Sequence, residues 1–263
     1  MNDNDALFYT NDLSISFGGL VAVDKVNFRV KRNTILGLIG PNGSGKTTIF
    51  NMITGLYTPT GGEIFFEGEN LVGRSATDIS RKGIARTFQI SRLCLDLSIL
   101  DNIFIGMHSR QKSWLIDTIF RRGRLSREVT EAYDKVTWLL NIFNPDLIAR
   151  AAEPAGALPQ IDRRRVEICR AMAMDPKLLL LDEPSAGMTP EEISVLMEDI
   201  KKVQQNSKDI TIIIVEHVMS VISAITEHCV VLNFGRKIAE GPFMDVAQNP
   251  EVREAYLGKR IGR

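Results

Sequence analysis

A glycine-rich segment near residue 40 has the residue types of a phosphate-binding loop. It fits the pattern GxxxxGK[ST] without a mismatch. The segment consists of Gly40, Pro41, Asn42, Gly43, Ser44, Gly45, Lys46 and Thr47, followed by Thr48. Glycines let a backbone approach phosphate closely and turn its N–H groups inward. The Lys46 ammonium would reach the terminal phosphates of a nucleoside triphosphate, and the Thr47 hydroxyl would bind Mg²⁺.

The sequence on either side of this loop has the periodicity that such a loop requires. Thr34–Ile39 is a short apolar run that predicts a buried strand, and Lys46–Gly55 has helical spacing with a glycine at its end. The loop therefore leads into a helix N-terminus, where the backbone dipole favours an anion. A chance glycine loop is the alternative, and the flanking strand and helix argue against it.

A pair of carboxylates follows a second apolar run. Leu178–Leu181 predicts a buried strand, and Asp182 and Glu183 come directly after it. Open α/β sheets bind ligands at the carboxyl ends of their strands. Asp182 would hold Mg²⁺ through water, and Glu183 would polarise an attacking water as general base. An exposed acidic turn before Pro184 is the other interpretation. Loop and carboxylates together predict a P-loop NTPase.

Further β-rich segments predict the layers that hold this site. Asp12–Phe17 and Leu20–Val30 flank Gly18-Gly19 and are expected to pair as antiparallel strands. More strands are expected at Glu63–Phe66, Ile210–Val215, Val230–Phe234 and Lys237–Glu240. The predicted fold class is α/β, with a P-loop NTPase (RecA-like) core and an N-terminal antiparallel β subdomain.

The middle of the chain predicts an inserted helical subdomain. Residues 98–144 show no clear strand and contain helix-like stretches such as Arg127–Leu140. A basic cluster lies in this region and consists of Arg110, Lys112, Arg121, Arg122, Arg124 and Arg127, with Asp117 as the one acid among them. Contact with lipid headgroups and a solvated charged face are both open interpretations of this cluster.

Three single residues gain meaning from their order around the phosphate loop. Phe17 lies in the first strand pair, Gln89 at the entry to the helical segment, and His217 after a buried strand. Taken alone, each has an ordinary interpretation as a core, solvated or structural residue. With the loop and the carboxylates, their arrangement resembles the ATPases of ABC transporters over residues 7–258. The expected domain plan is a core of residues 7–89 and 158–240, a helical subdomain of residues 90–157 and a C-terminal helical tail of residues 241–263.

This resemblance implies roles for the residues. Phe17 would stack on adenine, Gln89 would contact Mg²⁺ and water and couple to the membrane partner, and His217 would contact the γ-phosphate. ATP and Mg²⁺ are the implied cofactors. The implied metal site consists of Thr47, Gln89 and Asp182, and the implied catalytic residues are Glu183, His217 and Gln89. Ser185–Pro190 resembles the loop that crosses to an opposing subunit.

Three segments resemble the branched-chain amino-acid uptake subfamily in particular. They are Ser185–Pro190, Lys237–Gly241 and Asn249–Gly258. Related systems that carry amides or urea would share these segments, and Asn249-Pro250 with the helix after it is also an ordinary end for a domain. The resemblance implies an importer with transmembrane permease subunits, an extracytoplasmic solute-binding protein as an indirect partner, and a peripheral position at the cytoplasmic face of the cell membrane.

One stretch departs from the family pattern. The family has a Leu-Ser-Gly-Gly-Gln-like signature that binds the γ-phosphate held by the opposing subunit, and the aligned residues here are Leu158, Pro159, Gln160, Ile161 and Asp162. Pro159 offers neither hydroxyl nor N–H, Ile161 adds bulk, and Asp162 adds negative charge. We therefore predict that this stretch serves phosphate poorly and that the chain pairs with a second, different ATPase subunit. Asp162 as a cap of the following helix is a compatible alternative.

Composition limits the other function classes. Lys plus Arg and Asp plus Glu balance at 32 each, which argues against nucleic acid as a partner. Cys94, Cys169 and Cys229 are far apart and form no CxxC pair, and no stretch reaches the ~18 apolar residues of a membrane helix. A soluble ABC ATPase of repair or translation is the rival hypothesis, but the chain has one phosphate loop, no heptad arm and no cysteine cluster. A nucleotide binder without turnover is a second rival, against which the intact Glu183 and His217 argue.

Overall fold

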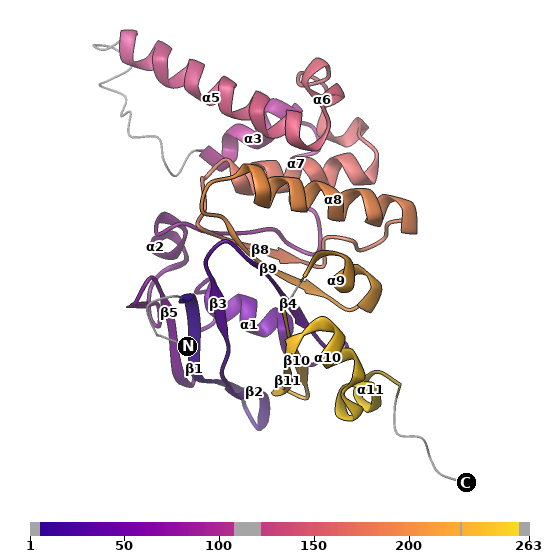
Figure 1. Ribbon diagram of the computed structural model, residues 1–263. Coiled ribbons are helices and arrows are strands. Elements are labelled where there is room, and N and C mark those ends of the chain that lie inside the picture. The colour runs from indigo at the N-terminus through magenta and orange to yellow at the C-terminus, as the bar shows by residue number, and fades with distance from the viewer. Residues whose placement is uncertain (1–5, 108–121, 227, 258–263) are drawn as a thin grey trace.

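The computed structural model describes residues 6–107, 122–226 and 228–257, and the strands in these ranges form two sheets (Figure 1). One is a five-stranded antiparallel sheet near the N-terminus, and the other is a six-stranded core sheet. Helices lie beyond the core sheet on the side away from the antiparallel sheet. The basic cluster falls largely outside the described residues, which exclude Arg110, Lys112, Asp117 and Arg121 and the side chains of Arg122, Arg124 and Arg127.

The antiparallel sheet is built around one long strand, β1 (Ala6–Phe17). The strands that complete it are β2 (Leu20–Val26), β3 (Arg29–Lys31), β5 (Gly61–Phe66) and β6 (Glu69–Asn70). The predicted hairpin is confirmed, because Phe17 pairs with Leu20 across the two glycines.

The segment expected as one strand, Leu20–Val30, is in fact two strands, β2 and β3. Thr10 of β1 lies opposite the break. Its hydroxyl donates to the Val26 carbonyl at 2.9 Å and accepts from the Phe28 N–H at 3.2 Å. The hydroxyl thus bridges the ends of β2 and β3, while the Thr10 N–H keeps a backbone bond to the Phe28 carbonyl at 3.0 Å, and regular pairing resumes in β3.

The core sheet is parallel except for one edge strand. Its order is β11 (Arg236–Pro242), β10 (His228–Asn233), β4 (Ile35–Ile39), β9 (Thr211–Glu216), β8 (Leu178–Asp182) and β7 (Ile84–Arg86). β11 is antiparallel to β10, and together they form the predicted final hairpin. The three-residue strand β7 was not expected from the sequence, because it is too short to show a period.

Alternate residues of the central strands pack into opposite layers. Leu178 and Leu180 belong to the apolar cluster beneath the antiparallel sheet, which also holds Phe50 of helix α1 (Lys46–Ile53). Leu179 and Leu181 belong to the cluster beneath the helical layer. Burial on both faces explains why this strand is continuously apolar. It also places α1, and with it the glycine-rich loop, between the two sheets.

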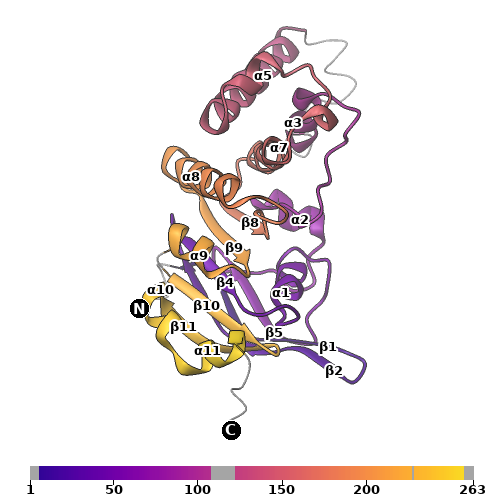
Figure 2. The same cartoon turned by 90° about the vertical axis from the view of Figure 1, so that its right-hand side faces the viewer.

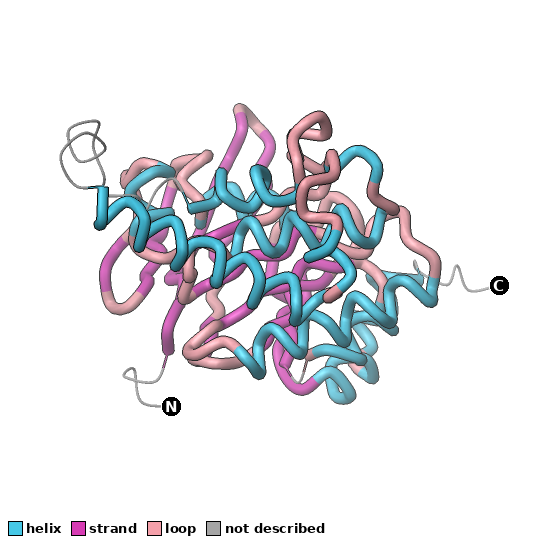
Figure 3. Tube along the Cα trace, turned by 90° about the horizontal axis from the view of Figure 1, so that it is seen from above, coloured by secondary structure: helices cyan, strands magenta, loops and turns pink. Residues whose placement is uncertain are grey.

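Helices α3, α5 and α7 lie together at one end of the molecule (Figures 1 and 2). The helices of the described chain besides α1 are α2 (Ala76–Arg81), α3 (Ile99–Met107), α5 (Arg122–Phe143), α6 (Asp146–Ala149), the 3₁₀ turn η3 (Ala155–Ala157), α7 (Gln160–Met172), α8 (Pro190–Asn206), α9 (Met219–Ile225), α10 (Phe243–Gln248) and α11 (Pro250–Leu257). The expected helix Arg127–Leu140 lies within α5. Seen from above, long helices cross over the strands (Figure 3). Helix α7 begins after the expected helical subdomain of residues 90–157. It nevertheless packs on α3 and α5, which lie within that subdomain.

The C-terminal helices α10 and α11 pack beside β10 and β11 (Figure 2). Among the helices in the described ranges, none combines the length and the apolar character needed to span a membrane.

Candidate nucleotide-binding site

The glycine-rich loop connects β4 to α1, as the sequence predicts. At two of its glycines a side chain would collide with neighbouring backbone. Gly40 has a φ of +152°, and a Cβ there would lie 2.2 Å from the Leu232 carbonyl oxygen. Gly45 has a φ of +105°, and a Cβ there would lie 2.9 Å from the Ala22 carbonyl oxygen. The loop is therefore held close to two strands, with Ser44 buried within it and its hydroxyl free of a hydrogen-bond partner.

Lys46 is the first residue of α1 and is almost fully buried. Its Nζ donates to the carbonyl oxygens of Gly40 at 2.7 Å and Pro41 at 2.9 Å, so the side chain follows the loop. Burial lowers the pKa of the ammonium. The opposing charge comes from carboxylates at the ends of the neighbouring strands, which belong to Glu183, Asp182 and Glu216. Thr47 and Thr48 continue the first turn of the helix with exposed and half-exposed side chains.

Three of the predicted catalytic side chains meet at one point. Gln89 Nε2 donates to Glu183 Oε2 at 2.9 Å, and His217 Nδ1 lies 3.7 Å from the same oxygen. These residues follow three neighbouring strands, because Gln89 comes after β7, Glu183 after β8 and His217 after β9. Parallel strands end at the same edge of a sheet, which explains how residues from three distant segments converge.

Asp182 ends β8 and is buried with its side chain 2% exposed. Arg86 Nη2 donates to Asp182 Oδ2 at 2.7 Å, and Asp182 Oδ1 is buried without a hydrogen-bond partner. A buried oxygen without a partner suits Mg²⁺, which prefers oxygen ligands and takes few of them from protein. No cluster of three or more His, Cys, Asp or Glu side chains able to hold a metal occurs in the described part of the chain. The single carboxylate therefore fits a metal that is shared with phosphate.

Glu216 is a site residue that sequence reasoning missed. It ends β9, is fully buried, and its Oε1 accepts from the Ser185 N–H at 3.0 Å. Its Oε2 has no hydrogen-bond partner and lies 4.0 Å from His217 Nδ1. Burial raises the pKa of the Glu216 carboxyl, against the bond from Ser185. A carboxylate at the end of an apolar run, as at Asp182, was the signal that could have identified it.

Phe17 lies at the end of β1 and is 47% exposed, so it is not a core residue. Its ring meets Tyr57 edge-on, with centroids 5.3 Å apart and planes at 73°. Tyr57, which was not singled out in the sequence, follows α1 and is also exposed. An exposed aromatic ring beside the helix of the phosphate loop offers a face on which a base can stack.

The altered signature stretch forms the start of α7, and its side chains engage the chain itself. Gln160 Nε2 donates to the Ala186 carbonyl at 2.8 Å. Asp162 is buried and pairs with Arg165 Nη1 at 2.9 Å, so its negative charge is compensated. The helix cap at this end is Pro159, without a side-chain capping bond, so the interpretation of Asp162 as the cap is wrong. Leu158 is buried, and Ile161 is half-buried at the surface of the helix.

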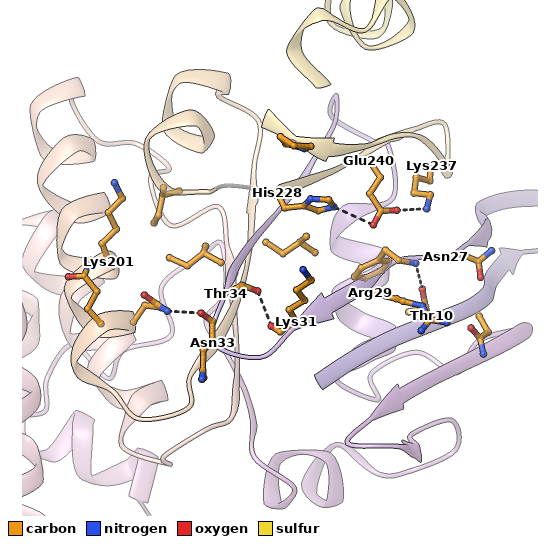
Figure 4. A pocket seen from close by; sticks show the side chains of 18 residues that line it. Thr10, Asn27, Arg29, Lys31, Asn33, Thr34, Lys201, His228, Lys237 and Glu240 are labelled. Carbon is orange, nitrogen blue, oxygen red and sulfur yellow. Dashed lines mark hydrogen bonds and ion pairs between the residues drawn. The ribbon is translucent and has the colours of Figure 1, made fainter. Parts of the chain in front are cut away.

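A separate groove of about 1120 Å³ lies at the opposite edge of the core sheet (Figure 4). It opens where β4 and β10 begin, and its wall includes His228, whose Nε2 lies 3.5 Å from Glu240 Oε1. None of the predicted site residues lines it. The groove is thus distinct from the nucleotide site, which lies where the parallel strands end.

The fold and the site define a P-loop NTPase. Two family models match the chain: "ABC transporter" over residues 23–186 and "Branched-chain amino acid ATP-binding cassette transporter" over residues 236–261. The chain therefore belongs to the ABC-transporter family, in which it is an ATP-binding subunit with ATPase activity.

Relatives and solved structures agree with this assignment. The high-affinity branched-chain amino acid transport ATP-binding protein LivG of Escherichia coli (strain K12) is 39% identical over 254 residues, which are 96% of this chain and 98% of that protein. The corresponding BraF protein of Pseudomonas aeruginosa is 38% identical over 94% of this chain and 96% of its own length. A nucleotide-free ATP-binding cassette of an ABC transporter superposes with a TM-score of 0.82 at 28% identity, covering 97% of this chain and all of that one. An ATP-binding cassette in its ADP conformation has a TM-score of 0.82 at 27% identity, over 97% and 99% of the two chains.

Proposed function

We propose that this chain hydrolyses ATP to energise an importer of branched-chain amino acids or closely related amides. The support for the cargo class is the match of residues 236–261 to a branched-chain family model and the names of the LivG and BraF relatives. A soluble ABC ATPase of repair or translation has no comparable support.

In the proposed mechanism, ATP lies with its phosphates over the loop and its adenine against Phe17. The Lys46 ammonium exchanges its hydrogen bonds to the loop carbonyls for bonds to the β- and γ-phosphates. Glu183 accepts a proton from the attacking water, while Gln89 and His217 orient that water toward the γ-phosphate. Asp182, Thr47 and Gln89 would hold Mg²⁺, which supplies charge neutralisation at the phosphate oxygens.

The convergence of Gln89 and His217 on Glu183 Oε2 is the observation that carries this proposal. Glu183→Gln keeps the size of the side chain and one oxygen that can accept a hydrogen bond, and it removes the carboxylate that acts as base. In the assembled transporter we expect ATP turnover to fall at least a hundredfold, because general-base catalysis contributes about 10²–10⁴. ATP binding, measured by equilibrium binding of labelled nucleotide, should persist and trap a closed state. Unchanged turnover would refute the role of Glu183 as base.

We further propose a second, different ATPase subunit as partner. The support is that Gln160 and Asp162 hold intramolecular contacts in place of the phosphate-facing groups of an intact signature. The experiment is ATP turnover by the purified chain alone and mixed with the ATPase encoded alongside it. Turnover only in the mixture, lost with Glu183→Gln in this chain, fits the asymmetric pair. Turnover by the chain alone that rises steeply with its own concentration contradicts it.

Permease subunits are the proposed membrane partners, which would hold the chain at the cytoplasmic face of the membrane. A groove of about 630 Å³ between α2, β7, α3 and α7 supports this, because its wall includes Thr87 and Phe88, directly before Gln89. Ile105 lines the groove and is 47% exposed. Ile105→Cys should form a cross-link to a cysteine-bearing permease, whereas a cysteine at exposed Glu198, on α8 and outside the groove, should not. An extracytoplasmic solute-binding protein would act through the permease.

We propose the domain division that the sequence predicts. It consists of a core of residues 7–89 and 158–240, a helical subdomain of residues 90–157 and a tail of residues 241–263. Helix α7 would join the two lobes, since it packs on α3 and α5 and also contacts β7 and α8.

A further inference from the structure

Arg86 lies at the end of β7, buried against the carboxylate assigned to the metal site. Its Nη2 donates to Asp182 Oδ2 at 2.7 Å, and the two side chains are 5% and 2% exposed. Its Nη1 donates to Asn51 Oδ1 on α1 at 2.7 Å. The guanidinium carbon lies 5.4 Å and 5.0 Å from the ring centroids of Phe50 and Phe88. One guanidinium thus connects β7, the end of β8 and the helix of the phosphate loop.

Because of this contact, the two carboxylate oxygens of Asp182 have different surroundings. Oδ2 is bound to Arg86, whereas Oδ1 is buried without a hydrogen-bond partner. The planar guanidinium, fixed at the same time by Asn51, sets the orientation of the carboxylate. We propose that Arg86 is a positioning residue that holds Asp182 by one oxygen so that the other oxygen is presented to Mg²⁺. The inference rests on the proposed function, which assigns Asp182 to that metal.

Stability alone does not account for an arginine in this place. Its surroundings include the aromatic rings of Phe50 and Phe88, against which an apolar side chain would also pack. Burying an ion pair carries a desolvation cost, and well-packed apolar residues often replace such a pair without loss of stability. Groups that orient a metal-binding carboxylate, in contrast, are needed for affinity and activity.

The test uses Mn²⁺ as the probe, measured by electron paramagnetic resonance on the full chain with a saturating non-hydrolysable ATP analogue. Arg86→Met should raise the Mn²⁺ dissociation constant roughly 10–100-fold. The Mn²⁺ dissociation constant of Arg86→Lys should lie between those of the parent and Arg86→Met, because one ammonium lacks the planar fork that binds Asp182 and Asn51 together. Affinity for the analogue in EDTA should stay unchanged in both variants. Arg92→Met is the matched control, since Arg92 lies 3.9 Å from the centroid of the same Phe88 ring and should leave Mn²⁺ affinity unchanged.

Mn²⁺ affinity that is unchanged or tighter in Arg86→Met overturns the positioning role. If that variant does not fold, Asn51→Ala decides, because it removes the 2.7 Å bond to Arg86 Nη1 and leaves that nitrogen only the weak 3.4 Å bond to Thr54 Oγ1. Weaker Mn²⁺ binding by Asn51→Ala supports the role, and unchanged binding overturns it. Asp182→Asn separates the two proposals. If it binds Mn²⁺ like the parent, the metal site itself is wrong; if it loses Mn²⁺ while Arg86→Met does not, only the role of Arg86 fails.

Discussion

Glu183 adopts a left-handed backbone conformation, with a φ of +44°. This region costs a non-glycine residue about 1 kcal/mol or more and is found where surrounding structure imposes it. Here the Glu183 N–H donates to the Val215 carbonyl of β9 at 2.9 Å, which fixes the turn after β8. Consecutive residues of a regular strand point to opposite faces. The strained turn instead brings Glu183 toward Gln89 and His217, next to buried Asp182.

Phe17 provides a test of the adenine platform. Stacking a base on an aromatic ring contributes about 1–3 kcal/mol, so Phe17→Ala should weaken ATP binding roughly fivefold or more. Phe17→Trp should retain it. Leu20→Ala is the control, because Leu20 is 68% exposed on the same hairpin and carries no ring. The measurement is nucleotide titration by isothermal calorimetry, and equal affinities for Phe17→Ala and the parent would exclude the platform.

Glu216 predicts a pH dependence of stability. Burial raises the pKa of its carboxyl above the ordinary value of 4.5. Between the ordinary pKa of the unfolded chain and the raised pKa of the folded chain, the folded chain binds more protons. The free energy of unfolding therefore falls as pH rises through this interval. Glu216→Gln keeps an oxygen for the Ser185 N–H and removes that loss. We expect Glu216→Gln to gain stability over the parent as pH rises above the ordinary carboxyl pKa of 4.5, measured by urea unfolding. A difference in the free energy of unfolding between Glu216→Gln and the parent that does not change with pH would contradict this prediction.

Helices α7 and α8 are joined by a buried ion-pair network beneath the altered signature. Arg165 bonds Asp162 within α7 at 2.9 Å and Asp199 of α8 at 2.7 Å. Asn144, just after α5, adds a 3.3 Å hydrogen bond to Asp162. Asp199 is only 2% exposed, and its charge is compensated by Arg165 and, at 3.3 Å from the other oxygen, by the more exposed Lys202.

Asp199→Asn tests this network as a link between elements. Loss of one partner from a buried pair costs about 3–5 kcal/mol, and we expect a loss of about 3 kcal/mol in the free energy of unfolding. Glu198→Gln is the matched control, because Glu198 is the exposed neighbour on the same helix and should change stability by less than about 0.5 kcal/mol. Chemical denaturation monitored by circular dichroism gives both values, and equal stabilities would show that the network contributes little.

In the whole molecule, the candidate site adjoins the groove that we propose for the permease. The groove includes Arg86, Thr87 and Phe88, and the same segment continues to Gln89 at the site. The altered signature lies at the start of α7, a helix that packs on both the helical layer and α8. The surface proposed for the permease thus adjoins the site through residues 86–89. The surface proposed for a second ATPase subunit adjoins it through Gln160, which bonds Ala186 in the loop after Glu183.

Restoring the signature tests the asymmetric pair at this scale. The double variant Pro159→Ser, Ile161→Gly returns a hydroxyl, an N–H and a close backbone approach to the start of α7. We expect the variant alone to gain ATP turnover of at least tenfold over the parent alone, because one regained donor in an oxyanion-type site contributes about 2.7–4 kcal/mol. Adding Glu183→Gln to the variant should abolish the gain. No gain would mean that the stretch is not what limits the chain alone.

The phosphate loop, the strand with its carboxylates and most strands of both sheets could be predicted from the sequence alone. These features depend on local rules, namely glycine geometry and the periods of buried strands, which residues near one another in the chain satisfy. Two features were not predicted from the sequence. The short strand β7 has too few residues to show a period, and the division of Leu20–Val30 into two strands depends on Thr10 of β1.

Which side chains meet depends on how distant segments pack together. Arg86 and Asp182 are 96 positions apart, and Gln89 and Glu183 are 94 apart. Their contact follows from the order of parallel strands β7, β8 and β9, which no local pattern encodes. Asp162 resembled a helix cap or a repelling charge and is instead compensated by Arg165 one turn along α7, and that arginine is bound by Asp199 of α8, 34 positions away. Long-range packing sets the partner of a charge, and that partner determines whether the charge repels a ligand, holds a helix or orients a metal site.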